Sequence, residues 1–308
     1  MAVMRNVLLA ASTNAWLRDR ATKAPFVKRS VRRFMPGEHV EDAMQAARGL
    51  RGQGINTILT ALGENLTRPE EAEEVTQHYL DEFDKVAEAG LDAQISIKPT
   101  QLGLDLDRGL CERNLDRLLD KADQRQNMLW IDMEGSPYVD RTLELYRCAR
   151  ARSPRVGIAL QAYLYRTQKD LEALPLGAAV RIVKGAYLEP ADLAYPKKSD
   201  VDENFYRLCV RMLSQESQRA GGLLHIATHD AALIDRLSAY CGEHDVPAAA
   251  YEFAMLYGIN VAQQKRLAGA GKRLRVLISY GEHWFPWYMR RLAERPANLW
   301  FVVKNVLG

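Results

Sequence analysis

Arg290 and Arg291 stand side by side in a segment with the features of a helix, WFPWYMRRLAERPANL (284–299). Trp287, the two arginines and Glu294 recur at spacings of three and four residues, so a helix would place them on one face. Guanidinium groups bind a carboxylate through parallel hydrogen bonds, in an orientation that lysine cannot impose. The pattern is typical of a carboxylate clamp. It is equally typical of a surface helix in which Arg290 pairs with Glu294, and the pattern alone leaves both interpretations open.

Further polar residues follow short apolar runs throughout the chain. Taken singly, such a residue is more often part of a loop than of a catalytic site, but here every run is accompanied by one or more of them. The cations Lys98, Arg181 and Lys184 favour an anionic ligand or a cofactor that bears phosphate. The polar groups at the runs, in chain order, are Glu64; Lys98; Asp132 and Glu134; Gln161 and Tyr163; Arg181, Lys184 and Tyr187; Thr228, His229 and Asp230; Tyr251 and Glu252; and Tyr280 and Glu282.

Eight such apolar runs, rich in β-branched residues, lie between residues 55 and 280. They are apolar on both faces, which is typical of strands buried on both sides in a parallel sheet. Longer amphipathic segments separate them. The clearest, Pro69–Glu88, has proline at its first position, acids in its first turn and Gly90 after its end. The runs are 55–62, 92–98, 127–133, 155–164, 178–184, 223–229, 246–254 and 274–280.

The alternation of strand and helix predicts an α/β protein, a (β/α)8 TIM-type barrel. The alternative is a doubly wound open sheet, but no G-x-G-x-x-G motif follows the first run. We expect an N-terminal helical arm over residues 1–54, a catalytic barrel over 55–308, and a final helix displaced over the barrel mouth. Active sites of such barrels lie at the carboxyl ends of the strands, where the polar residues named above would stand.

The composition excludes several classes of protein. The chain has 308 residues, 47% of them hydrophobic and 26% charged, and its net charge of +3 gives no argument for a nucleic-acid partner. Its four cysteines are too widely spaced for a metal site, and we expect no metal and a reducing compartment. The N-terminal apolar run lacks a signal-peptide cleavage site, and no run of 18 apolar residues occurs. We therefore expect a cytoplasmic protein.

Seven segments resemble, in the same order, the motifs of the proline dehydrogenase family. The match as a whole runs from about residue 62 to residue 298, and RIVKGAY (181–187) and YMRRLAERPAN (288–298) are the most specific segments. The resemblance is to the monofunctional bacterial type. It implies a flavin enzyme of proline catabolism that oxidises L-proline to Δ1-pyrroline-5-carboxylate by hydride transfer to N5 of FAD. A quinone or another acceptor would then take the electrons. The segments are ISIKPTQLG, WIDMEGS, QAYLYRT, RIVKGAY, IATHD, YEFAMLYGI and YGEHWFPWYMRRLAERPAN.

The resemblance also implies roles for residues of this chain. The residues that it places on the cofactor are Met133, Gln161, Arg181, Lys184, Gly185, Ala186, Thr228 and His229. Those that it places on the substrate are Glu64, Lys98, Tyr187, Leu277, Trp287, Arg290 and Arg291. The catalytic set is Lys98, Asp132 and Arg181. Arg181 would lie near flavin N5, Asp132 would orient Lys98, and Glu64 would pair with an arginine to close the site.

Two of the implied substrate positions depart from the family pattern. The family usually has a tyrosine four residues before the glycine of the YGE motif and another three residues before the paired arginines. This chain has Leu277 and Trp287 there. The departures bear on the identity of the substrate more than on the type of reaction. A substituted or different-sized cyclic amino acid, such as hydroxyproline or another proline analogue, is therefore an alternative to proline. A family member that tolerates both changes is the other interpretation.

Two further hypotheses belong to other classes of protein. One is a flavin-binding barrel that has lost turnover. The charged positions of the family are retained in this chain, which argues against that hypothesis. The other is peripheral contact with the inner face of the membrane, where a quinone would be reached. Candidates for that contact are the basic segment 18–33, the aromatic residues around Trp284 and the C-terminal segment NLWFVVKNVL. A C-terminal helix packed on the barrel is the structural alternative.

Overall fold

The structure is a computed structural model that describes residue 27, residues 30–63 and residues 66–294, with the backbone alone for 291–294. Several expected features lie outside the described residues. They are the first part of the arm (1–26), Glu64, the side chains of Arg291 and Glu294, and the apolar C-terminal segment (295–308).

Eight parallel strands form a closed barrel in which each strand pairs with the next and β8 pairs with β1. The predicted (β/α)8 TIM-type barrel is thereby confirmed. The register places Ile58 of β1 opposite Gln94 of β2 and Leu277 of β8. The strands are β1 (Asn56–Ala61), β2 (Ala93–Ile97), β3 (Leu129–Ile131), β4 (Val156–Gln161), β5 (Ala179–Val183), β6 (Leu223–Ala227), β7 (Tyr251–Leu256) and β8 (Leu274–Tyr280).

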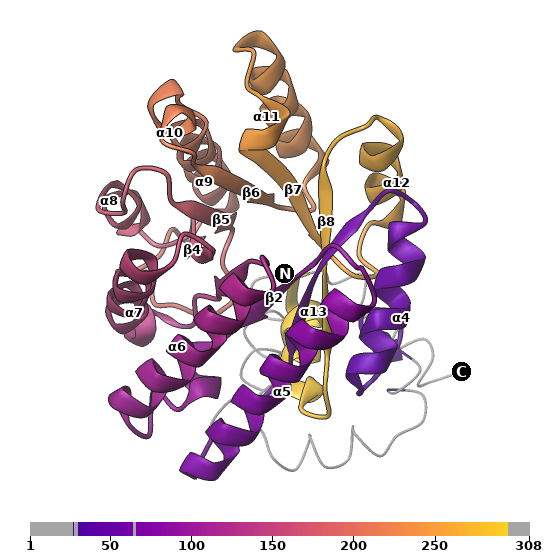
Figure 1. The fold of residues 1–308 in the computed structure, drawn as a ribbon. Helices are drawn as coiled ribbons and strands as arrows, with labels where there is room; N and C mark the ends of the chain where they lie inside the picture. Colours follow the sequence, from indigo (N-terminus) through magenta and orange to yellow (C-terminus); the bar gives the residue numbers. More distant parts are fainter. Residues whose placement is uncertain (1–26, 28–29, 64–65, 295–308) are drawn as a thin grey trace.

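Helices surround the barrel, as Figure 1 shows. The helix with the strongest sequence signals, α5 (Pro69–Glu88), has the predicted bounds, and the Glu71 carboxylate accepts hydrogen bonds from the backbone N–H groups of Thr67 and Arg68 at its start. The other α-helices are α4 (Val40–Arg51), α6 (Arg108–Gln124), α7 (Val139–Arg152), α8 (Thr167–Glu172), α9 (Lys198–Met212), α10 (Gln215–Arg219), α11 (Ala231–Glu243), α12 (Val261–Gly269) and α13 (Trp284–Glu294). Short 3-10 helices are η1 (Pro99–Leu102), η2 (Ser136–Tyr138) and η3 (Ala248–Ala250).

Two predicted segments differ from the structure in their bounds. The seventh run was expected to start at 246, but η3 intervenes and β7 begins at Tyr251, because Pro247 has no backbone N–H for a strand ladder. Glu252 therefore lies at the amino end of its strand, away from the mouth. The helical segment after residue 200 divides at Ser214, whose hydroxyl accepts a hydrogen bond from the backbone N–H of Ser217 and starts α10.

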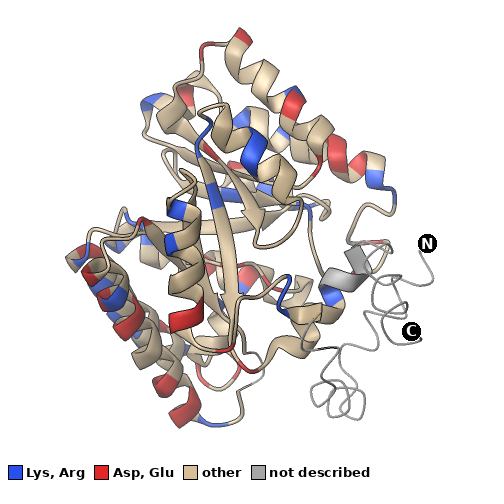
Figure 2. Cartoon of the chain, turned by 90° about the vertical axis from the view of Figure 1, so that its right-hand side faces the viewer, with Lys and Arg blue, Asp and Glu red and all other residues tan. Residues whose placement is uncertain are grey.

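Alternate side chains of each strand face the barrel interior. Ser96 of β2, Asp132 after β3 and Arg181 of β5 contact one another across that interior. Residues two positions away on the same strands therefore share this side. The intervening residues, such as Ile95 and Val180, join the apolar core between strands and helices. The strand ribbons in Figure 2 carry few charged positions, whereas the outer helices carry both signs.

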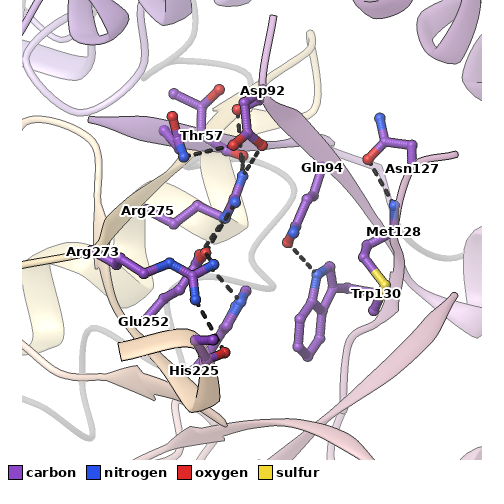
Figure 3. A network of polar contacts seen from close by, with 12 residues as sticks. Thr57, Asp92, Gln94, Asn127, Met128, Trp130, His225, Glu252, Arg273 and Arg275 are labelled. Atoms are coloured by element: carbon purple, nitrogen blue, oxygen red, sulfur yellow. Dashed lines mark hydrogen bonds and ion pairs between the residues drawn. The ribbon is translucent and has the colours of Figure 1, made fainter. Parts of the chain in front are cut away.

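A charged network closes the amino-terminal end of the barrel (Figure 3). The Arg275 guanidinium donates to Glu252 at 2.6 Å and to Asp92 at 2.8 Å, and it also donates to the backbone carbonyl of Thr57 at 3.1 Å. Arg273 is a second partner of Glu252. Because these charges are paired inside the barrel, they form its floor and leave the opposite, carboxyl-terminal end for a ligand.

Part of the N-terminal arm packs against α13. Val27, Val31, Phe34 and Met35 form one apolar cluster with the buried aromatic residues Trp284, Phe285, Trp287 and Tyr288. The hydroxyls of Ser30 and Tyr288 are 2.7 Å apart, and the Trp284 indole N–H donates to Glu38 at 3.0 Å. The four aromatic side chains are therefore packed against the arm, and peripheral membrane contact stays a prediction. Within the described ranges, no helix is both long and apolar enough to span a membrane.

Glu82, buried between α5 and the barrel, makes stability depend on pH. Neither of its carboxylate oxygens has a hydrogen-bond partner of normal geometry among the described residues. Burial raises the pKa of Glu82 to about 8, although the nearby Tyr280 hydroxyl offsets part of this. The folded state then keeps a proton that the unfolded state releases, so stability falls as pH rises from 4.5 to 8.

We expect Glu82→Gln to remove this loss. Because one pKa unit corresponds to about 1.4 kcal/mol, the unfolding free energy of the wild type should fall relative to that of the variant by roughly 4 kcal/mol across this window. Urea unfolding at pH 4.5, 6 and 8.5 measures the difference. Glu74→Gln, at an exposed position of α5, is the control. An unchanged difference between wild type and Glu82→Gln at all three pH values would contradict the prediction.

Candidate active site

Arg181 lies at the centre of the candidate site. It projects from β5 into the barrel and is 3% exposed. Its Nη2 donates to the Ser96 hydroxyl at 2.8 Å and forms an ion pair with Asp132, whose carboxylate also accepts from Ser96 at 3.0 Å. Residues of β2 and of the segment after β3 therefore hold one end of the guanidinium in place. Burial lowers the pKa of Arg181, and the Asp132 carboxylate opposes this shift.

The other end of the Arg181 guanidinium has no acceptor in the described part of the chain. Its Nη1 is buried and has no hydrogen-bond partner among the described residues. An unsatisfied buried donor costs about 1–3 kcal/mol, more when charged, and a polar ligand would supply the missing acceptor. This donor is therefore directed at a ligand rather than at the protein.

Lys98 follows β2 on the same inward face as Ser96 and is 8% exposed. Its ammonium forms no ion pair with any of the residues that the structure describes. Asp132 pairs with Arg181, and among the described residues it forms no ion pair with Lys98, so the orientation of Lys98 by Asp132 stays a prediction. Lys98 is therefore a buried cation at the mouth whose charge is available to an anionic substrate.

Gln161 and Met133 are both buried at the mouth, on the neighbouring strand ends of β4 and β3. The Gln161 amide donates to the backbone carbonyl of Glu134 at 2.9 Å, which fixes the side chain. The Glu134 carboxylate accepts from the backbone and the hydroxyl of Thr100, at 3.2 and 2.7 Å. These contacts tie the loops after β2, β3 and β4 to one another.

Lys184, after β5, belongs to a cluster of two cations and two anions. Its ammonium is 2.5 Å from Asp202 and 3.1 Å from Asp230, and Lys198 contacts the same two carboxylates. Burial by itself would raise the pKa of Asp230, but hydrogen bonds from Lys198 and Lys184 outweigh burial and lower it. The expected phosphate-binding lysine thus already has its charge balanced by protein.

The loop after β5 brings Tyr187 under Arg290. The Arg290 guanidinium carbon is 5.4 Å from the centre of the Tyr187 ring, and Arg290 is only 9% exposed. At Gly185, φ is +115°, and a Cβ there would lie 2.3 Å from the Tyr163 ring. Glycine therefore lets this loop pass close to Tyr163, with Ala186 half-buried beside it.

The loop after β6 contributes Thr228 and His229. The Thr228 hydroxyl accepts from the backbone N–H of Asp230 at 3.1 Å. The His229 Nε2 accepts from the backbone N–H of Leu256 at 3.3 Å, which ties this loop to the end of β7. Both residues therefore stand at the same end of the barrel as Lys184.

The two positions that depart from the family pattern have different surroundings. Leu277 is half-buried on the inward face of β8, opposite Leu256 of β7. Trp287 is 8% exposed and packs into the cluster formed by the arm and α13. The structure therefore assembles most of the predicted site residues at one end of the barrel, apart from Glu64 and the Arg291 side chain, which lie outside the described residues.

Sequence reasoning missed the partners that hold these residues. Ser96, Asp202 and Trp130 were not among the candidates, although each contacts a predicted site residue. Ser96 could have been found, because it stands two residues before Lys98 on a strand. Asp202 lies on a helix 18 residues after Lys184, and only the fold brings the two together.

Comparison with known proteins gives a consistent result. The family model described as proline dehydrogenase matches residues 43–304. Proline dehydrogenase 1 of Bacillus subtilis subsp. natto is 37% identical over 307 residues, covering 99% of either chain, and the Deinococcus radiodurans proline dehydrogenase is 38% identical over 281 residues, or 89% of either chain.

Solved structures support the fold. Proline utilization A from Bdellovibrio bacteriovorus, inactivated by N-propargylglycine, has a TM-score of 0.79 at 21% identity over 87% of this chain. The protein of that name from Corynebacterium freiburgense has a TM-score of 0.74 at 20% identity over 98% of this chain. This chain spans about a third of their length (33% and 34%). From the family match and the relatives, we conclude that this chain is an oxidoreductase that belongs to the proline dehydrogenase family.

Proposed function

We propose that the chain oxidises L-proline to Δ1-pyrroline-5-carboxylate with FAD as its cofactor, and that a quinone-type acceptor then takes the electrons. Flavin supplies an N5 that accepts a hydride from the ring carbon next to the proline nitrogen. The single observation that carries the proposal is the Arg181 guanidinium, which is buried, fixed at one end and, among the described residues, without an acceptor at the other.

In this proposal, Arg181 stabilises negative charge that develops during hydride transfer. A fixed cation in a dry barrel does so without reorganisation, which makes its effect larger than in water. Asp132 and Ser96 keep the guanidinium in place. Met133, Gln161, Gly185, Ala186, Thr228 and His229 are proposed as cofactor contacts, because their strand ends surround Arg181.

The substrate would be held by its carboxylate. Lys98 and Arg290 are the described cations proposed for this role, and Arg291 is proposed to complete it. Glu64 is proposed to pair with an arginine and close the site. Arg290 is stacked over Tyr187, which would limit its orientations and leave Tyr187 in contact with the substrate ring. Lys184 is proposed to face the cofactor phosphates, with Asp202 and Asp230 setting its position. Holding the donor carbon in one place is the main requirement of hydride transfer.

The test is the absorption spectrum of the purified protein during anaerobic titration with L-proline. The proposal expects a yellow protein whose flavin bands bleach on addition of L-proline, with Δ1-pyrroline-5-carboxylate as the product. A quinone added afterwards should restore the bands. A colourless protein that does not bind FAD would contradict the cofactor, and a yellow protein that proline does not bleach would support a flavin-binding barrel without turnover.

A second candidate is the same reaction on a substituted cyclic amino acid. The observation that favours it is Leu277, an apolar side chain that faces the barrel interior next to Leu256. Leu277 itself offers no donor to a polar ring substituent, and an apolar side chain at this position favours an apolar substituent. An apolar contact of this size changes substrate preference by about ten- to a hundredfold.

We expect Leu277→Tyr to raise kcat/KM for L-proline relative to 4-methylproline by about tenfold, because the phenol fills the space of the methyl group. Leu277→Met, which keeps an apolar side chain of similar volume, should leave the ratio unchanged. Steady-state assays with L-proline, 4-hydroxyproline, 4-methylproline and pipecolate measure the preference. A wild type that strongly prefers L-proline, together with a Leu277→Tyr variant that shows no gain, would exclude the second candidate.

A further inference from the structure

Trp130 is the largest side chain in the barrel interior, and it lies beside Arg181. The Arg181 guanidinium carbon is 5.1 Å from the centre of the indole ring. Trp130 is fully buried on β3, directly before the segment that carries Asp132. Its ring therefore contacts the same guanidinium that the Asp132 carboxylate binds at Nη2.

The indole ring is fixed by more than packing. Its Nε1 donates to the Gln94 side chain at 2.7 Å, and Gln94 is itself buried (Figure 3). A Cβ at Gly157 would lie 2.5 Å from the ring, so only glycine on β4 leaves room for it. Hydrogen bond and glycine together set one position for the ring.

His225 of β6 packs against the same indole. The two ring centres are 4.2 Å apart, with an angle of 33° between the planes. Burial, together with Arg275, Arg181 and Arg273, lowers the pKa of His225 well below its usual value, so the imidazole is neutral. Its Nε2 only approaches Glu252, at 3.5 Å. The imidazole thus supports the indole without placing a second cation next to Arg181.

We propose that Trp130 is a positioning residue, whose indole ring, held by Gln94 and packed against His225, sets the plane of the Arg181 guanidinium toward the flavin. Asp132 and Ser96 fix one end of that guanidinium, and a planar group held at one end can still rotate. Contact with an aromatic face restricts the rotation, because a cation–π contact is stronger away from water. The inference rests on the proposed function, because that function assigns Arg181 its role in stabilising charge during hydride transfer.

Two substitutions at Trp130 separate positioning from packing. Trp130→Leu removes the aromatic face, and we expect kcat for L-proline to fall by about tenfold with KM changed less than about twofold. The midpoint potential of the bound flavin should become more negative, because the reduced cofactor loses a well-placed positive charge. Trp130→Phe keeps an aromatic face and should retain most of the activity and of the potential. Phe253→Leu, a buried substitution on the outer side of β7, is the matched control and should alter neither.

Gln94→Leu gives a second test that does not depend on the stability of Trp130→Leu. It leaves the indole N–H without its acceptor, so kcat and the midpoint potential should shift in the same direction as in Trp130→Leu, by a smaller amount. In a Trp130→Phe background the same change should have no effect, because phenylalanine has no N–H to orient. An equal effect of Gln94→Leu in both backgrounds, or no effect in either, would overturn the proposal.

The outcomes also distinguish this inference from the proposed function. The midpoint potential is measured by reductive titration with dithionite and needs no substrate. If proline does not bleach the wild type, the proposed function fails, whereas the potentials of the variants still test the role of Trp130. If proline bleaches the wild type and Trp130→Leu, folded and loaded with FAD, retains the wild-type kcat and potential, the inference about Trp130 fails alone.

Discussion

Replacing Arg181 by methionine should lower the rate of flavin reduction by L-proline by about a thousandfold, the range seen when a preorganised charge is removed from a transition state. Methionine has a similar length but no charge and no donor. The loss should appear in kcat, since Arg181 stabilises charge that develops only during the reaction. Stopped-flow absorbance under anaerobic conditions measures the rate directly and separates it from reoxidation.

Two control variants separate the effect of the Arg181 charge from the effect of losing an arginine elsewhere. Arg181→Lys keeps the charge but cannot bind Asp132, Ser96 and the ligand together, so it should recover only part of the rate. Arg166→Met removes another arginine that pairs with two carboxylates, on the outside of the barrel, and should leave the rate unchanged. A flavin-loaded Arg181→Met variant with a rate within about threefold of wild type would exclude a catalytic role for Arg181.

Arg290→Met should raise KM for L-proline by about a hundredfold and change kcat less. The expected loss is that of one charge-assisted hydrogen bond to a buried carboxylate, about 2–3 kcal/mol. The carboxylate does not change during the reaction, so the contact should favour substrate and transition state alike. Steady-state kinetics over a wide range of L-proline concentrations separates the two constants.

A substrate without a carboxylate provides the control for Arg290. Prolinamide should be a poor substrate of the wild type, and Arg290→Met should not make it poorer. The matched variant is Arg236→Met, because Arg236 also lies over a tyrosine, Tyr206, at 3.4 Å, but on the outer surface. An Arg290→Met variant with the wild-type KM for L-proline would exclude Arg290 from the carboxylate site.

Local patterns determined much of the fold. β5 (Ala179–Val183) and β6 (Leu223–Ala227) fall within their predicted runs because a strand buried on both faces must be apolar at nearly every position. α5 (Pro69–Glu88) has its predicted bounds, since proline and acids at its start and Gly90 after its end act within one turn. Where the strand pattern was weaker, the predicted bounds were wrong. At β7 the strand begins later than predicted, because the three alanines after Pro247 form η3 first.

Long-range pairing could not be predicted in the same way. Asp132 pairs with Arg181, 49 residues away in the chain, a pairing that the sequence did not predict. Glu252 was placed among the strand-end residues, yet it lies in the floor of the barrel with Arg275. Charge and spacing indicate that a residue needs a partner. They do not identify it when several opposite charges approach the barrel interior from different strands.

The arginine pair Arg290–Arg291 shows what the sequence determined and what only the tertiary structure decided. The sequence by itself determined that two guanidinium groups stand on one helix after the eighth strand, because helical periodicity is a local property of three to four residues. Only the tertiary structure decided that Arg290 lies over Tyr187, which comes from the loop after β5 about a hundred residues earlier. It likewise decided that Trp130, unremarked in the sequence, lies beside Arg181. Closure of the barrel fixes the strand register, and the register determines which inward side chains meet.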